Sequence, residues 1–261
     1  RAAVQAMIDA QTDFRGDIGF FTPGAYSIAT TALTFNVANA RYLGPPVRNP
    51  RRSTVTITDA IGDWSVEADN QEFGFLRFVP LTAQNTFTNT TGSDGVYFHD
   101  YWWDATGVAT STSTEFWRSV SAASDYLFER GIHQVDAAQG DAFTLVGAHR
   151  WVWRDCDFLV VGPTITQATW ITFATTISAS CVADTCRFFG AGGANALITN
   201  CVTGMTGAGI FKAQYCTVDG TAMPTAGNFE TGFDATVGIE LIENYLTGDA
   251  TTEGGVLIKL T

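Results

Sequence analysis

The fold of this chain is decided by three short stretches that share one pattern: RDCDF (154–158), DTCRF (184–188) and QYCTV (214–218). Each stretch has a cysteine at its centre and an apolar residue two positions later: Cys156 and Phe158, Cys186 and Phe188, Cys216 and Val218. The stretches lie 30 residues apart. Because alternate residues of a strand point to opposite faces, the cysteine and the apolar residue are predicted to point inward and to stack in columns.

The same alternation places the remaining side chains of these stretches outside: Asp155, Asp157, Thr185, Arg187, Tyr215 and Thr217. Similar blocks recur along the chain at 73–78, 96–103, 126–132, 151–161, 181–189, 210–218 and 238–246. One apolar anchor in each block gives steps of 26 to 30 residues: Phe75, Trp103, Ile132, Phe158, Phe188, Val218 and Leu246. A period of this size indicates a solenoid, here with three short strands and their turns in each coil.

The composition agrees with short strands. Only 15% of the 261 residues are charged, against about 25% in an average domain, while the chain contains 37 Thr and 26 Gly. Helix-rich proteins usually carry Glu, Lys and Arg on their surfaces, whereas β-branched residues and glycine favour strands and turns. The glycine-rich segments 190–195, 204–209 and 248–255 are predicted to be turns between strands.

Charge and cysteine content exclude several classes of protein. The net charge is −12, the lysines are only Lys212 and Lys259, and no basic run occurs, so we expect no nucleic-acid partner. The uncharged stretch 158–183 contains Pro163 and Gln167 and is interpreted as strands, so we expect no membrane insertion. The five cysteines include no CxxC pair, which favours free buried thiols in a chain made in a reducing cytoplasm. We expect no cofactor and no metal site.

The N-terminus begins differently. Residues 1–12 predict a short amphipathic helix with Val4, Met7 and Ile8 on one face. Short strands are predicted after it at 18–20, 26–28, 32–37 and 40–43, with a tight turn at 22–25.

This opening, AVQAMIDA (3–10) followed by GDIGFFTPGAYSIATTALTF (16–35) and Tyr42-Leu43-Gly44, resembles the entry to right-handed parallel β-helix proteins of the pectate-lyase-like superfamily. That superfamily includes many bacteriophage tailspikes. The resemblance covers roughly residues 2–44 and implies an all-β fold: a single-stranded right-handed parallel β-helix with an N-terminal capping helix.

We therefore expect one domain over 1–261, divided into three parts. Residues 1–44 form the cap and entry strands, 45–125 form irregular coils with insertions, and 126–261 form regular coils. Pro45-Pro46, the segment 49–52 and the polar run 86–95 are interpreted as excursions from the coil. The last stretch, 255–261, predicts one more strand at an open coil end, which a neighbouring subunit would cover. Phage β-helix proteins usually form trimers, so the resemblance implies a homotrimer.

Hydrolases on such scaffolds need two or three converging carboxylates. Asp155 and Asp157 share an outward face and Glu129 is expected one coil earlier, so these three are the catalytic candidates. The alternative is that Asp157 forms a surface ion pair with Arg187. The Asn-Thr-Asp, Asp-Asp, His-Gly and Arg-Ile-Lys pattern of polygalacturonases is not found in the chain, and we expect no catalytic site.

Aromatic and acidic residues of one block form a second candidate site for glycans or for a subunit interface: Tyr97, Asp100, Tyr101, Trp102, Trp103 and Asp104. Exposed rings stack on sugar faces while carboxylates meet hydroxyls. Core packing is the alternative for these rings. Trp151 and Trp153 share one face of their strand and would form a partner surface if that face is exposed.

The favoured function is a structural or adhesive component of a tailed-bacteriophage virion, tailspike-like or a head decoration, with other virion proteins and host-surface polysaccharide as partners. Glycan contact without cleavage is expected. The alternatives are a polysaccharide depolymerase (a lyase or glycoside hydrolase) on the same fold, and a secreted bacterial adhesin.

Overall fold

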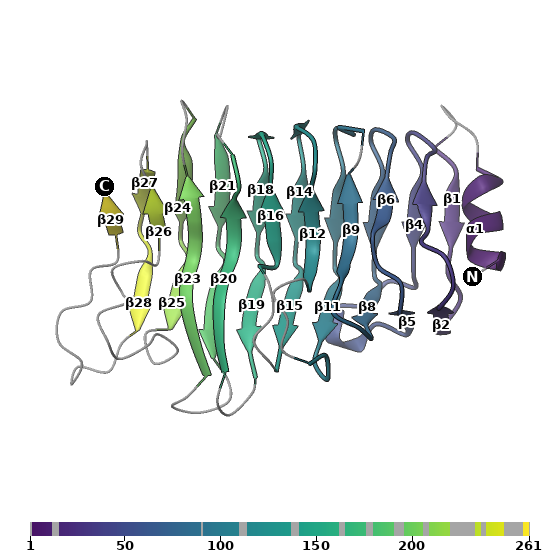
Figure 1. The fold of residues 1–261 in the computed structure, drawn as a ribbon, viewed down its shortest axis with the longest axis horizontal. Helices are drawn as coiled ribbons and strands as arrows, with labels where there is room; N and C mark the ends of the chain where they lie inside the picture. Colours follow the sequence, from purple (N-terminus) through teal and green to yellow (C-terminus); the bar gives the residue numbers. More distant parts are fainter. Residues whose placement is uncertain are drawn as a thin grey trace.

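The computed structural model describes most of the chain: residues 2–11, 16–89, 91–109, 114–136, 141–161, 165–175, 180–190, 196–205, 209–219, 233–235, 239–247 and 258–260. One helix, α1 (Ala2–Asp9), lies at the N-terminal end, and the rest of the regular structure is short strands and one 3-10 turn. The strands stack into a long right-handed parallel β-helix, as predicted (Figure 1). No helix among the described residues is long and apolar enough to cross a membrane.

Three parallel sheets form the sides of the coil. Sheet A contains, in order along the axis, β1 (Ile18–Phe20), β4 (Arg41–Leu43), β7 (Glu72–Gly74), β10 (Tyr97–His99), β14 (Leu127–Glu129), β18 (Val152–Arg154), β21 (Cys181–Asp184), β24 (Phe211–Gln214) and β27 (Ile239–Ile242). Sheet B contains β2 (Gly24–Ile28), β5 (Val55–Asp59), β8 (Arg77–Pro80), β11 (Trp102–Ala105), β15 (Ile132–Val135), β19 (Asp157–Val160), β22 (Arg187–Gly190), β25 (Thr217–Asp219) and β28 (Tyr245–Thr247).

Sheet C contains β3 (Thr34–Phe35), β6 (Trp64–Val66), β9 (Asn85–Asn89), β12 (Glu115–Ser119), β16 (Phe143–Leu145), β20 (Ile165–Phe173), β23 (Ala196–Met205), β26 (Phe233–Ala235) and β29 (Ile258–Leu260). A small fourth sheet pairs β13 (Ala123–Ser124) with β17 (Ala148–His149). Each predicted block after residue 72 therefore contains one strand of sheet A and one of sheet B, separated by a bend.

The register confirms most of the predicted anchors. One column of sheet B runs through Tyr26, Ile57, Phe78, Trp103, His133, Phe158, Phe188, Val218 and Leu246. Two anchors were wrong: Phe78, and not Phe75, lies in this column, and His133 replaces Ile132. Phe75 lies in a corner between two strands, with φ 60°. Ile132 precedes His133 by one residue and pairs with Trp102, so its side chain is on the opposite face of sheet B from the column.

The corner between sheets A and B is a two-residue turn that repeats in every coil after residue 74. Its first residue adopts a left-handed backbone: Phe75, Asp100, Arg130, Asp155, Thr185, Tyr215 and Glu243. The backbone N–H of that residue donates to a carbonyl of the next coil, as Asp155 N does to Asp184 O at 2.9 Å. The ladder therefore continues through the turn, and the turn's second residue points inward at Cys156, Cys186 and Cys216.

The core is a series of stacked rings and thiols. Phe73 stacks on Phe98 at 4.5 Å between ring centroids, and Phe98 on Phe128 at 5.4 Å. All five cysteines are free and buried, and the thiols of Cys156, Cys186 and Cys216 donate to backbone carbonyls of a neighbouring coil at 3.4–3.5 Å. These contacts confirm the predicted inward columns.

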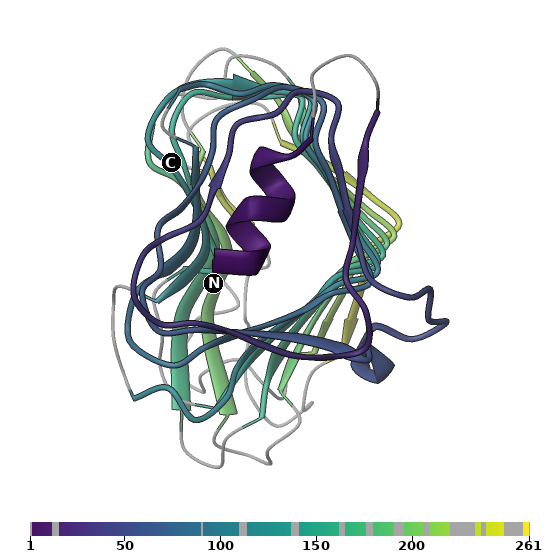
Figure 2. The same cartoon turned by 90° about the vertical axis from the view of Figure 1, so that its right-hand side faces the viewer.

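Helix α1 lies across the open end of the first coil (Figure 2). Its Val4 and Ile8 are buried, and Gln5 bonds to both the N–H (3.2 Å) and the carbonyl (3.1 Å) of Thr34 in β3. The helix therefore covers the apolar interior and satisfies part of a strand edge, as a cap must.

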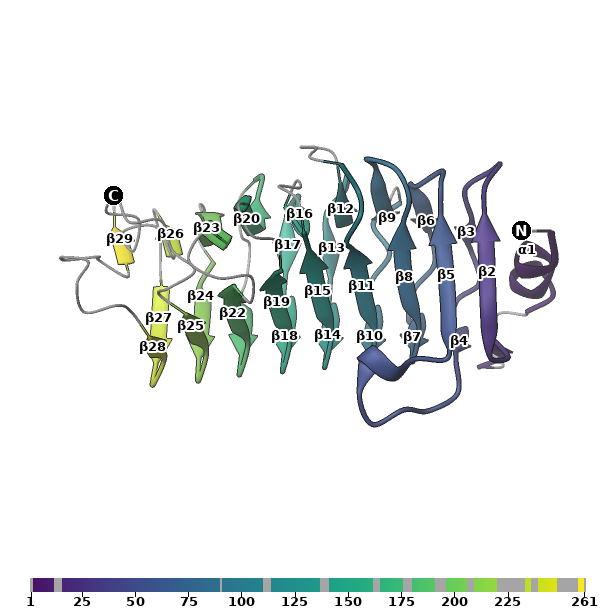
Figure 3. The ribbon, with the colours of Figure 1, turned by 90° about the horizontal axis from the view of Figure 1, so that it is seen from below.

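One predicted excursion is confirmed and one is wrong. The segment after β4 leaves the coil, forms the 3-10 turn η1 (Pro50–Arg52) and returns at β5, projecting below sheet B in Figure 3. The polar run 86–95, in contrast, begins with β9, whose residues are all buried. It stays in the coil because its polar groups find internal partners: Asn89 bonds to Ser121 O and to Val120 N. Of the predicted glycine-rich turns at 190–195, 204–209 and 248–255, residues 191–195, 206–208 and 248–255 lie outside the described residues. Gly190 ends β22 and residues 204–205 end β23, so these positions are strand and not turn.

Candidate functional site

A groove runs along the outer face of sheet B beside its corner with sheet A. It consists of two adjoining hollows of about 500 and about 250 Å³ that share Asp155, Asp157 and Arg187. The larger hollow is lined by Arg48, Asn49, Pro50, Arg51, Asp100, Arg130, Gly131, Ile132, Asp155, Asp157, Arg187 and Phe189. The projecting loop at 48–51 therefore forms one wall, and successive coils form the floor.

Asp157 and Arg187 occupy the same register position in neighbouring coils of sheet B. The guanidinium binds the carboxylate through two hydrogen bonds of 2.6 Å, from Nε and from Nη2. The predicted ion pair is confirmed. Asp155 lies at the corner with φ 52° and is exposed, and its carboxylate has no side-chain partner among the described residues.

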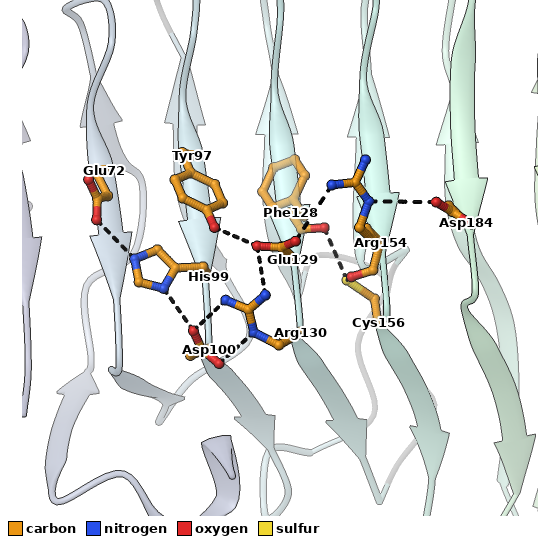
Figure 4. Close-up of polar contacts among 10 residues, drawn as sticks. All are labelled: Glu72, Tyr97, His99, Asp100, Phe128, Glu129, Arg130, Arg154, Cys156 and Asp184. Carbon is orange, nitrogen blue, oxygen red and sulfur yellow. Dashed lines mark hydrogen bonds and ion pairs between the residues drawn. The ribbon is translucent and has the colours of Figure 1, made fainter. Parts of the chain in front are cut away.

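A chain of charges links the groove to the outer face of sheet A (Figure 4). Arg130 donates to Asp100 through Nε and Nη2, both at 2.8 Å, and its Nη1 lies 2.8 Å from Glu129. Tyr97 donates its hydroxyl to Glu129 at 2.5 Å. His99 lies between two carboxylates, 3.0 Å from Glu72 and 2.9 Å from Asp100. Each carboxylate in this row of linked side chains, namely Glu72, Asp100 and Glu129, thus has a cationic or hydrogen-bonding partner.

These contacts set the protonation of the carboxylates. Burial raises the pKa of Glu129, but the Tyr97 hydrogen bond and the charge of Arg130 outweigh it and leave the pKa below its usual value. In Asp100 burial likewise raises the pKa, and the Arg130 and His99 hydrogen bonds lower it further than burial raises it. Both groups are therefore ionised near neutral pH, which suits charge pairing and not proton donation.

A general acid needs the opposite shift. Among the described residues, the carboxyl pKa lies above its usual value at Asp59, Glu115 and Asp141, because burial there outweighs the contacts that lower it. None of these three lines either hollow of the groove. The groove thus contains the predicted candidates Asp155 and Asp157, with Glu129 beside it. Asp157 and Glu129 are paired with arginines, whereas Asp155 has no side-chain partner among the described residues.

The predicted aromatic site is divided between the two faces of the strand. Tyr101, Trp103, Trp151 and Trp153 are fully buried, so their assignment to a glycan or subunit surface was wrong. The coil interior is wide enough to need large side chains: Trp151 stacks on Tyr126 at 4.1 Å and donates to Ala123 O at 2.9 Å, and Trp103 donates to Thr86. Core packing, the alternative considered for these rings, is what the structure shows.

The other members of this set are not in the core, and their side chains contact charged or polar groups. Tyr97 is half-buried against Glu129, and Trp102 lies under the Arg77 guanidinium, 4.1 Å from the ring centroid. Asp104 is buried, bonded to Arg77 and to Thr106. Of the whole set, only Asp100 lines the groove.

Sequence reasoning missed the arginines of the groove. Arg51 was assigned to an excursion without a role, and Arg48 and Arg130 were not considered. A signal existed, because Arg48, Arg51 and Arg52 place three of the chain's 14 basic residues within five positions. No group of three or more His, Cys, Asp or Glu that could hold a metal ion occurs among the described residues.

The fold and the groove define the class: a right-handed parallel β-helix protein with a charged groove on one sheet. No family model and no curated protein matches the chain. The crystal structure of a pectin methylesterase from Aspergillus niger is similar, with a TM-score of 0.60 and 13% identity over 98% of this chain and 85% of that one. ORF18 of Geobacillus virus E2 matches with a TM-score of 0.36 and 10% identity over 95% of this chain and 58% of that one. At these identities the likeness to the pectin methylesterase shows the fold alone.

Proposed function

We propose that this chain is a structural and adhesive component of a tailed-bacteriophage virion, tailspike-like or head-decorating, which contacts host-surface glycans in the groove without cleaving them. The virion assignment rests on the entry sequence, residues 3–44, and its resemblance to phage β-helix proteins.

The observation that carries the non-catalytic part is the pairing of the groove carboxylates. Asp157 is held by Arg187, Asp100 by Arg130, and Glu129 by Arg130 and Tyr97. Glycoside hydrolysis needs one protonated and one free carboxylate on either side of the bond. Among the described carboxylates of the groove only Asp155 is unpaired, so the two-carboxylate arrangement of a hydrolase is missing. The floor instead presents the charged and hydrogen-bonding groups that fix a polar ligand.

The test of this part uses the purified protein and a panel of capsular polysaccharides and lipopolysaccharides. Binding is measured on immobilised glycan, and the supernatant is assayed for new reducing or unsaturated ends. We expect binding to at least one polymer with no new ends. Robust release of ends would overturn the non-catalytic assignment.

The virion part has a separate test in the genes that flank the coding sequence. Capsid or tail genes beside it support the proposal. A neighbourhood of bacterial export or sugar-utilisation genes contradicts it.

A depolymerase is the second candidate, and one observation favours it. The exposed Asp155 lies in the same groove as the Asp157–Arg187 pair and has no side-chain partner among the described residues, so its carboxylate is free to act. The fold of the pectin methylesterase is compatible with this candidate. If ends are released, Asp155→Asn should abolish the release while Asp125→Asn, at the corner of sheet A, should not.

A further inference from the structure

The arginines of this chain fall into two groups. Seven of the described arginines lie within 4 Å of a carboxylate: Arg41, Arg77, Arg118, Arg130, Arg150, Arg154 and Arg187. The other three, Arg48, Arg51 and Arg52, have no carboxylate partner among the described residues. All three lie on the loop that forms one wall of the groove. In an acidic chain of net charge −12, three unpaired arginines on one loop call for a physical reason.

The backbone of the loop is anchored, which fixes the points from which its arginine side chains extend. Asn49 accepts a hydrogen bond from the N–H of Arg51 at 2.9 Å and caps the turn at 50–52. Ser53 donates to the carbonyl of Phe75 at 2.7 Å, which ties the end of the loop to the next coil. Arg48 and Arg51 line the larger hollow; Arg52 does not.

The floor adds further N–H donors on the other side of the hollow. A guanidinium has five N–H groups, and the two that bind a carboxylate side by side leave the rest for another acceptor. The side chain of Arg130 is 44% exposed and that of Arg187 is 59% exposed, although both are paired. The lining of this hollow contains four arginines and three aspartates, so it is locally cationic on a strongly anionic chain.

We infer that the groove takes the anionic group of an acidic glycan, with Arg48 and Arg51 of the loop on one side of that group and Arg130 and Arg187 of the floor on the other. This inference rests on the proposed glycan contact and names its ligand class. Carboxylate and sulfate or phosphate substituents share the required chemistry, since each accepts paired N–H bonds from a guanidinium. Two of the arginines, Arg48 and Arg51, have no competing carboxylate to displace.

The test compares Arg48→Ala/Arg51→Ala with Arg52→Ala, a matched control on the same loop that lies outside the hollow. The probes are hyaluronan, polysialic acid and the acidic capsular polymers of the panel, their carboxyl-reduced forms, and neutral dextran. We expect the double variant to bind the best acidic probe at least about tenfold more weakly, a change of about 1.4 kcal/mol, because it loses two cationic groups that face the anionic group. Arg52→Ala should stay within about twofold, since Arg52 does not line the hollow.

For a polymer whose anionic groups are all carboxylates, carboxyl reduction should weaken binding at least as much as the double variant does. Equal binding by the double variant and the wild type, or equal binding of the reduced and native forms of such a polymer, would overturn the inference. Binding of neutral dextran alone would overturn this inference and leave the proposed glycan contact standing. Absence of binding to every polymer would contradict both, and cleavage of a bound acidic polymer would contradict only the non-catalytic assignment.

Discussion

At the scale of single residues, adjacent side chains of one strand point to opposite sides, one outward and one into the core. Trp102 faces outward beneath Arg77, while Trp103 is fully buried and pairs in register with Phe78 and His133. Strand alternation accounts for the difference. Whether a given tryptophan can meet a ligand thus depends on a one-residue step.

The first prediction follows from that step. Trp103→Ala should lower the free energy of unfolding by about 3–5 kcal/mol, because it leaves a large hole in a packed core. Trp102→Ala should cost about 1 kcal/mol, the loss of a partly exposed cation–π contact. Urea unfolding of the two variants measures both values, and equal losses would contradict the assigned faces.

The charge pairing of Asp100 gives a second prediction at the residue scale, which concerns how the stability of the protein depends on pH. The pKa of Asp100 is lower in the folded protein than its usual value, so the carboxylate stabilises the fold above about pH 4 and this contribution disappears as the pH falls through the folded pKa. Asparagine tolerates the left-handed backbone at this position. The stability gap between wild type and Asp100→Asn should therefore be widest near neutral pH and shrink on acidification.

Glu115 serves as a control, because its pKa is shifted in the direction opposite to that of Asp100. Burial raises its pKa above the usual value, so the folded state holds this proton more tightly than the unfolded state does. The wild type should gain stability relative to Glu115→Gln as the pH falls. Chemical denaturation at a series of pH values measures both gaps, and a gap for Asp100→Asn that widens in acid would refute the pairing argument.

At the scale of elements, the cap and the projecting loop both depart from the repeating coil in the part of the chain that the structure describes. Helix α1 covers the first coil with Val4 and Ile8, and the loop at 48–51 makes a wall for the groove. Neither element repeats, and both occur in the N-terminal half of the chain. The repeat forms the scaffold, and these single additions close it and shape its surface.

The cap supplies the third prediction. Ile8→Asp should destabilise the protein and expose apolar coil interior, because a charge would replace a fully buried side chain. Ala6→Asp, on the exposed side of the same helix, should be tolerated. Thermal unfolding and light scattering compare the two, and an equally stable, non-aggregating Ile8→Asp protein would contradict the capping role.

The coil repeat could be predicted from the sequence, but the structure of the run 86–95 and the groove could not, for physical reasons. Cys156, Cys186 and Cys216 revealed the coil because their spacing is constant and each points inward. The run 86–95 was misassigned, since its polar residues are satisfied by partners some 30 residues away, such as Ser121 for Asn89, and nearby sequence does not show them. The groove was missed for the same reason: Arg48 and Arg187 come together only when the coils stack.

At the scale of the whole molecule, the low charge of the chain follows from its repetition. Each coil covers the next, so little of the surface of a strand needs charge, and six of the ten described arginines pair with a carboxylate of a neighbouring coil. The outcome is an elongated scaffold in which one groove crosses several successive coils of one sheet.

Assembly is the prediction at this scale. We propose a homotrimer, which the resemblance of the entry sequence to phage β-helix proteins implies. Sedimentation should give a mass near three times 28.0 kDa. A stable monomer at micromolar concentration would contradict the proposed assembly.

The central claim is that the groove holds an acidic glycan and leaves it intact. The most direct measurement is the molar-mass distribution, by light scattering, of an acidic polysaccharide before and after long incubation with an excess of the protein. We expect the polymer to co-elute with the protein and to keep its original length. A polymer that shortens with the wild type, and keeps its length with Asp155→Asn/Asp157→Asn, would contradict it.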